Sequence, residues 1–88
     1  EIEQIVRLQI KGIQRMLEDN GVNLQLSDMA IDFLATAGYD PEFGARPVKR
    51  AIQRYLLNDL SKKLLSMAVD RSKPIIVERD SEGLKFRN

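Results

Sequence analysis

Apolar residues recur three or four positions apart at the start of the chain, the spacing of one helix face. The stripe consists of Ile2, Val6, Ile10, Ile13 and Leu17, and Ile5 and Met16 widen it. Asn20 and Gly21 follow, and both readily take the left-handed conformation that ends helices. The pattern predicts a helix that runs to about Asp19.

The next two elements are predicted to be short. Apolar residues at 22, 24 and 26 alternate with polar ones, as in a strand with one buried face. Ser27 is then a good helix N-cap, and Asp28 places negative charge in the first turn. The buried face of this second helix is expected to comprise Ala30, Ile31, Phe33, Leu34 and Ala37, and Gly38 ends it.

A third and longest helical pattern begins after Pro47. Its apolar positions are Val48, Ile52, Tyr55, Leu56, Leu60, Leu64 and Met67. Two apolar segments, 75–78 and 84–86, flank Asp-Ser-Glu-Gly and predict a hairpin with a longer turn. The order helix, strand, helix, helix, strand, strand favours an α+β fold: three helices with a small three-stranded sheet.

Length and composition exclude several classes of protein and of functional site. At 88 residues, the chain is expected to form a single domain, and its start at Glu1 suggests a piece of a longer protein. Cysteine and histidine are absent, which excludes disulfides, thiolate or imidazole metal ligands and a histidine general base. No apolar run approaches the roughly 20 residues that span a bilayer, so we expect a cytoplasmic protein without a membrane partner.

Four basic residues lie close together around the start of the third helix: Arg46, Lys49, Arg50 and Arg54. Arg46 precedes a helix N-terminus, where a cation is unfavourable beside the helix dipole. A guanidinium near free backbone N–H groups is also suited to bind phosphate. Two simpler alternatives are that these cations are solvated, or that Arg46 pairs with Asp40 or Glu42 and fixes the loop.

Other features of this loop carry less chemistry. Tyr39 and Phe43 could stack on a base, but we expect them to anchor the loop to the core. The chain has neither a phosphate-binding P-loop nor an apolar strand that ends in an acidic pair for magnesium. With 14 basic and 13 acidic residues, its charge gives no reason to expect a nucleic-acid partner.

One segment resembles a known family. The sequence GYDPEFGARPVKRAIQ, residues 38–53, closely resembles the segment of Clp-type AAA+ unfoldases that contains their second sensor arginine. Residues 5–40 and 54–65 are also similar to the C-terminal small domain, or lid, of the second AAA+ module in ClpB disaggregases. The resemblance covers almost the whole chain.

The resemblance implies a role for each residue of this motif. Arg46 would contact the terminal phosphate of ATP bound by a separate large domain, which would also hold Mg²⁺. Gly44 and Ala45 would keep the approach to the nucleotide clear, and Pro47 would start the helix. Lys49 and Arg50 match a basic pair that could make secondary contacts. No catalytic or metal-binding residue is expected in this chain.

The resemblance also implies partners. The fragment would not be an enzyme by itself, but its parent would be an AAA+ ATPase. The lid would pack on the large domain of its own chain and on a neighbouring subunit in a homohexamer, and the parent would act on unfolded or aggregated proteins with other chaperones.

Three alternatives remain open at this point. The same lid could come from a protease-coupled unfoldase of the ClpA or ClpC type. The chain could be a stand-alone nucleic-acid-binding module that uses the face from Arg46 to Arg54. It could also be an interaction platform in which Arg46 serves only loop packing.

Overall fold

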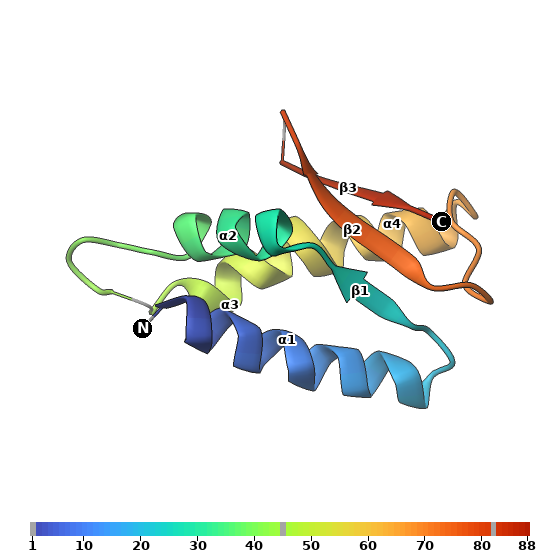
Figure 1. The fold of residues 1–88 in the computed structure, drawn as a ribbon, viewed down its shortest axis with the longest axis horizontal. Coiled ribbons are helices and arrows are strands. Elements are labelled where there is room, and N and C mark those ends of the chain that lie inside the picture. The colour runs from blue at the N-terminus through green and yellow to red at the C-terminus, as the bar shows by residue number, and fades with distance from the viewer. Residues whose placement is uncertain (1, 45, 82) are drawn as a thin grey trace.

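The computed structural model, which describes residues 2–44, 46–81 and 83–88, confirms the predicted α+β fold (Figure 1). The elements in order are α1 (Ile2–Asp19), β1 (Leu24–Leu26), α2 (Asp28–Ala37), α3 (Val48–Ala51), the π-helical η1 (Ile52–Leu57), α4 (Asn58–Leu65), β2 (Ile75–Asp80) and β3 (Gly83–Arg87). Because α3, η1 and α4 follow one another without a gap, they form one long helical segment, 48–65.

The three strands form one sheet in the order β1-β2-β3. β1 pairs in parallel with β2, with Leu24 opposite Ile75, and β2 pairs antiparallel with β3, with Val77 opposite Phe86. All four of these side chains are buried, so they mark the core face of the sheet. The pairing of Asp80 with Gly83 makes the hairpin connection shorter than the predicted longer turn.

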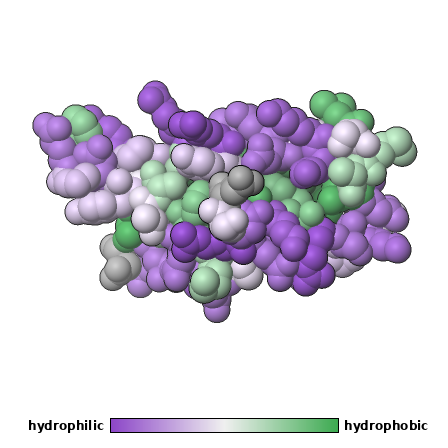
Figure 2. All heavy atoms as spheres, turned by 90° about the horizontal axis from the view of Figure 1, so that it is seen from above, coloured by the Kyte–Doolittle hydropathy of each residue, from purple (hydrophilic) through white to green (hydrophobic). Residues whose placement is uncertain are grey.

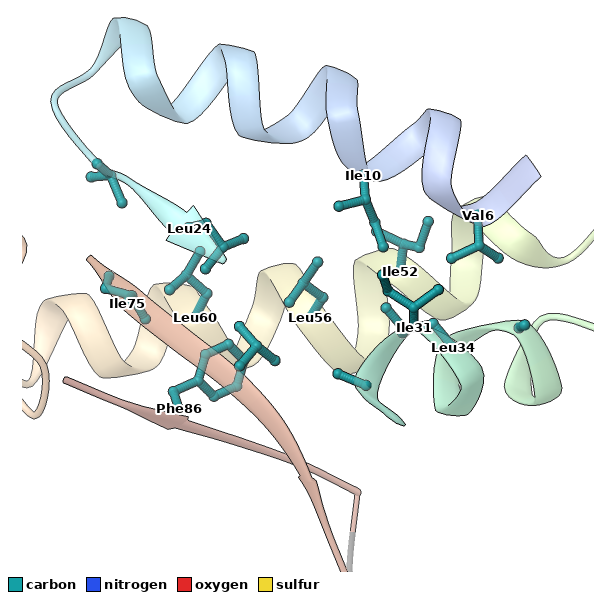
Figure 3. Packing of buried hydrophobic residues seen from close by; sticks show 14 of the residues in the cluster. Val6, Ile10, Leu24, Ile31, Leu34, Ile52, Leu56, Leu60, Ile75 and Phe86 are labelled. Atoms are coloured by element: carbon teal, nitrogen blue, oxygen red, sulfur yellow. The ribbon is translucent and has the colours of Figure 1, made fainter. Parts of the chain in front are cut away.

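The core lies where α1, α2, the sheet and the long helical segment meet, and Figure 3 shows their apolar side chains pointing toward one another. Every residue that is buried among those described is apolar or glycine. The cluster comprises Val6, Ile10, Val22, Leu24, Ala30, Ile31, Leu34, Ala35, Val48, Ile52, Leu56, Leu60, Val69, Ile75, Val77 and Phe86. Burial of apolar surface is therefore the main source of stability.

The long helical segment buries every fourth residue, namely Val48, Ile52, Leu56 and Leu60. In a regular α-helix such a row drifts by about 40° at each step, because four residues exceed one turn of 3.6. η1 has wider turns, as shown by the N–H of Asn58, which donates to the carbonyl of Gln53 five residues earlier. This wider winding reduces the drift and keeps the row facing the core.

The buried face of α1 is narrower than the sequence predicted. Val6 and Ile10 are buried, but the side chains of Ile5 and Met16 are 39% and 51% exposed. The reason is that α1 is covered from one side, where it contacts α2, α3 and β1. Its prediction as a helix ending at Asp19 is confirmed.

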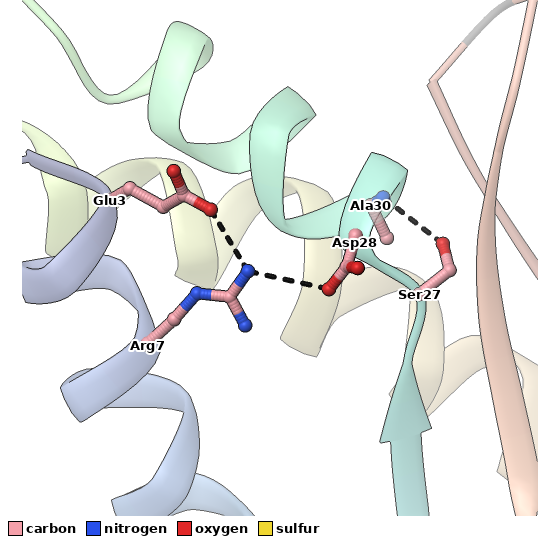
Figure 4. Close-up of polar contacts among 5 residues, drawn as sticks. All are labelled: Glu3, Arg7, Ser27, Asp28 and Ala30. Atoms are coloured by element: carbon pink, nitrogen blue, oxygen red, sulfur yellow. Dashed lines mark hydrogen bonds and ion pairs between the residues drawn. The ribbon is translucent and has the colours of Figure 1, made fainter.

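Polar contacts fix the start of α2 (Figure 4). The hydroxyl of Ser27 accepts a hydrogen bond from the N–H of Ala30 at 3.1 Å, which confirms the predicted N-cap. Arg7 of α1 lies 2.9 Å from the Glu3 carboxylate and 3.3 Å from that of Asp28. Arg7 thus links α1 to α2 on the surface, and these two carboxylates raise its pKa.

Two helices end with the same hydrogen-bond pattern, the Schellman motif. After α1, Val22 donates to the Leu17 carbonyl, and Gly21 takes the left-handed conformation at φ 79°. After α4, Ala68 donates to the Lys63 carbonyl, and the left-handed residue is Met67 at φ 59°. A non-glycine residue is therefore strained at the second site.

The prediction that Met67 belongs to the core is wrong, because it lies in this strained turn. Met67 was expected on the buried face of the third helix, but it lies beyond α4 and its side chain is 86% exposed, as is that of Leu65. Exposed apolar surface gathers at the end of the molecule where α4 finishes (Figure 2).

Within the described residues, every helix is too short or too polar to serve as a membrane span.

The two ends of the loop 39–47 are held together by a close backbone approach. Gly38, which follows α2, is buried. A β-carbon built at this position would lie 2.9 Å from the Cα of Val48 and 3.1 Å from the carbonyl oxygen of Leu34. Only glycine leaves room for this packing of α2 against the start of α3.

We expect Gly38→Ala to lower the free energy of unfolding by about 1–3 kcal/mol, because the added methyl group forces backbone at Val48 to move. Gly12→Ala is the matched control, since Gly12 lies within α1 with open space around it. That change should raise stability by up to about 1 kcal/mol. Urea denaturation of the chain measures both, and equal effects of the two substitutions would contradict the packing argument.

We expect Met67→Gly to raise the free energy of unfolding by up to about 1 kcal/mol, because glycine relieves the left-handed strain at little cost in buried surface. Met67→Ala is the control, as it removes the exposed side chain and keeps the strain. Thermal unfolding of both variants checks this. A gain in melting temperature that is as large for alanine as for glycine would show that the strain is not the cause.

Candidate anion-binding site

The loop between α2 and α3 is ordered by a tight turn over residues 40–44. Asp40 and Gly44 exchange two backbone hydrogen bonds of 2.9 and 2.6 Å. The Asp40 carboxylate accepts hydrogen bonds from the backbone N–H groups of Glu42 and Phe43 at 2.7 and 3.0 Å. Gly44 closes the turn at φ 63°, a conformation that favours glycine. The residue types of the sequence DPEFG therefore specify this turn.

Arg46 leaves this turn just before the long helical segment begins. Its backbone N–H donates to the Phe43 carbonyl at 3.2 Å, and its side chain is exposed. The centre of the guanidinium lies 5.1 Å from the centroid of the Phe43 ring, which is a cation–π contact. The predicted start of the third helix after Pro47 is confirmed, since α3 starts at Val48 and Pro47 occupies its N-cap position.

The structure does not support the simpler alternative in which Arg46 pairs with an acidic loop residue. Within the described part of the chain, the ion pairs involve Arg7 and Arg87, and none joins Arg46 to a carboxylate. Asp40 directs one carboxylate oxygen to backbone N–H groups of its own turn. The positive charge of Arg46 is therefore left without a neutralising partner among the described residues.

Arg46 and Arg50 lie at the same hollow, which has a volume of about 320 Å³. Asp40, Phe43 and Pro47 complete its lining. Lys49 is exposed but does not line this hollow, so the structure separates it from the two arginines. Of the two basic residues in the motif, Arg50 therefore lies beside Arg46, whereas Lys49 lies outside the hollow.

A second, smaller hollow of about 130 Å³ continues along the long helical segment. Pro47 and Arg50 line both hollows, and Arg54 and Tyr55 line the second. Arg54 lies over the Tyr55 ring at 5.3 Å. Arg50 is therefore placed between Arg46 and Arg54 along one basic surface.

The aromatic residues of the loop differ from expectation. Tyr39 and Phe43 were expected to anchor the loop in the core, but their side chains are 55% and 51% exposed. The anchoring interpretation is wrong because the turn is held by its own backbone and by Asp40. The contact of Phe43 with Arg46 was missed, although a spacing of three residues across a turn could have indicated it.

Two other residues of the predicted motif, Gly44 and Pro47, lie close to Arg46. Gly44 is half-buried within the turn, and Pro47 lines the first hollow. Ala45 lies outside the described residues. A larger hollow of about 750 Å³ lies at the opposite end of the molecule, along the connection from α4 to β2 and beside Asn88, and none of the predicted site residues is in its lining. Among the described residues, no group of three acidic side chains could hold a metal ion.

The arrangement of the charged side chains indicates which ligands this site can bind. Two exposed guanidinium groups line one hollow, and a guanidinium donates paired hydrogen bonds to phosphate or carboxylate oxygens. The one acid among the described lining residues, Asp40, accepts hydrogen bonds from backbone N–H groups of its own turn. Its described lining residues can therefore bind part of an anion.

Comparisons with known proteins show which family the chain resembles. Residues 1–77 match the family described as the C-terminal, D2-small domain, of ClpB protein. The whole chain is 72% identical to a Chaperone protein ClpB of Bacteroides thetaiotaomicron and 50% identical to one of Porphyromonas gingivalis. It is 46% identical over 98% of its length to Chaperone protein ClpB 2 of a Nostoc species.

The chain spans about 10% of the length of each of these relatives. The similarity is to ClpB chaperones and extends over all the elements of the fold. It therefore favours ClpB over the protease-coupled alternative. Together with the α+β fold, it shows that this chain belongs to the ClpB family, as its C-terminal D2-small domain.

Proposed function

We propose that this chain is the lid domain of a longer ClpB-type protein that uses ATP to disaggregate other proteins. In this proposal Arg46 contacts the terminal phosphate of ATP bound by the adjacent large domain. The observation that carries the proposal is the exposed Arg46 guanidinium, which lies at a hollow with Arg50 and has no carboxylate partner among the described residues.

The residues of the hollow fit part of a bound nucleotide. Arg46 and Arg50 offer charge-assisted hydrogen bonds to phosphate oxygens. ATP would supply the negative charge of its phosphates, and the residues that hold Mg²⁺ and orient water would belong to the large domain. This chain would contribute recognition of the nucleotide and would not carry out hydrolysis.

The fold suits a lid that moves as one body. α1, α2, the long helical segment and all three strands share one apolar core, so the loop that carries Arg46 is attached to all of them. A phosphate that binds Arg46 would thereby bias the position of the whole domain relative to the large domain. We further propose that this domain contacts a neighbouring subunit and supports assembly of a homohexamer.

In the full-length protein, we expect Arg46→Ala to weaken binding of a non-hydrolysable ATP analogue at the second module about tenfold or more. The reason is the loss of charge-assisted hydrogen bonds, each worth about 1.5–3 kcal/mol. Arg50→Ala should have a smaller effect, because Arg50 is proposed to make only secondary contacts. Calorimetry or a fluorescent nucleotide, with the first module disabled, measures these affinities.

Lys49→Ala is the matched control, because it removes a neighbouring exposed cation that does not line the hollow. Its effect on nucleotide affinity should be less than about twofold. If Arg46→Ala leaves affinity unchanged, or only matches Lys49→Ala, the phosphate contact is wrong. Circular dichroism of each variant excludes loss of the fold as the cause.

A further inference from the structure

Among the described residues, the Arg46 side chain forms no ion pair, and its guanidinium lies over the Phe43 ring. The guanidinium centre lies 5.1 Å from the ring centroid, within the range of a cation–π interaction. A long arginine side chain at an exposed position otherwise samples many rotamers, and ordering it opposes binding. A contact that restricts these rotamers in advance would lower that cost.

Phe43 is itself held firmly by the turn. Its N–H donates to the Asp40 carboxylate at 3.0 Å, and its carbonyl accepts the N–H of Arg46 at 3.2 Å. The ring and the guanidinium therefore extend from backbone positions that are hydrogen-bonded to each other. The stack is a local unit and does not depend on packing against the core.

An aromatic ring has an advantage over a carboxylate as the support for this arginine. A carboxylate at Phe43 would hold the guanidinium by hydrogen bonds, but it would neutralise the charge and occupy the donors that a phosphate needs. A ring attracts the cation through its face and leaves the N–H groups at the guanidinium edge free for oxygen acceptors. Asp40 is the only acid among the described residues that line the hollow, and it accepts hydrogen bonds from its own turn.

We propose that Phe43 is a positioning residue, whose ring holds the Arg46 guanidinium ready for an anionic ligand while it leaves the charge available. The inference rests on the proposed contact of Arg46 with the terminal phosphate of ATP. Although Phe43 also lines the hollow, its proposed effect on the terminal phosphate acts through Arg46. Substitution of the ring must therefore matter only when Arg46 is present.

The experiment is a double-mutant cycle in the full-length protein, with equilibrium binding of a non-hydrolysable ATP analogue and of ADP at the second module. Phe43→Leu keeps an apolar side chain of similar size and removes the ring. It should weaken binding of the ATP analogue about two- to fivefold, the range of an exposed cation–π contact. Binding of ADP, which has no terminal phosphate for Arg46, should stay unchanged.

Three further variants distinguish positioning from other roles. Phe43→Tyr retains the ring and should bind like the unsubstituted protein. Phe43→Leu combined with Arg46→Ala should bind no more weakly than Arg46→Ala alone. Tyr39→Leu is the matched control, since Tyr39 is a similarly exposed aromatic residue of the same loop, and among the described residues its ring makes no cation–π contact with Arg46.

Each contrary result has a defined meaning. If Arg46→Ala has no effect on the ATP analogue, the proposed function fails and the inference falls with it. If Arg46→Ala weakens binding but Phe43→Leu does not, only the inference is overturned. It is also overturned if Phe43→Leu weakens binding equally with and without Arg46, or if Tyr39→Leu has the same effect as Phe43→Leu.

Discussion

The structure depends on the row of buried side chains that repeats at every fourth residue of the long helical segment. Val48, Ile52, Leu56 and Leu60 face a core shared with α1, α2 and the sheet. A regular α-helix would turn this row gradually away from the core, and the wider π-helical turns of η1 oppose that drift. The exposed row of Arg46, Arg50 and Arg54 has the same spacing. Because Arg50 and Arg54 lie on this segment, its winding also keeps these two residues along one surface, and Arg46 precedes them in the turn.

Two local devices fix the candidate loop on this framework. Gly38 brings the end of α2 against Val48, so the two ends of the loop are held close together. Between them, Asp40 uses its carboxylate to close a turn. This acid stabilises the loop without pairing with the nearby arginine. The separation of these roles allows a loop that is rich in charged residues to be ordered while a cation stays free to bind a ligand.

Most of the fold could be predicted from the sequence because its helices and strands have strong apolar periodicity and clear caps, as at Ser27 and Gly21. The exposure of Ile5 and Met16 could not be predicted, since it depends on which neighbours cover α1. Met67 was placed wrongly because its apolar character fits the helical period, while the chain reverses there with a left-handed residue. In the site, the residue types indicated an anion. Sequence spacing alone does not give side-chain directions. It therefore could not show that Arg50 lines the hollow while Lys49 does not, or that Phe43 lies against Arg46.

The parallel pairing of β1 with β2 has a consequence for the order in which the protein is assembled. Leu24 lies opposite Ile75, so this pair encloses α2, the loop with Arg46 and the entire long helical segment. Such a distant pairing carries a large loop-closure cost and forms late compared with local helices. On the ribosome, β1 cannot pair with β2 until residues 75–77 have emerged, and β3 completes the sheet later still. The nascent domain would therefore leave the apolar helix faces uncovered by the sheet until nearly all of this sequence has been synthesised.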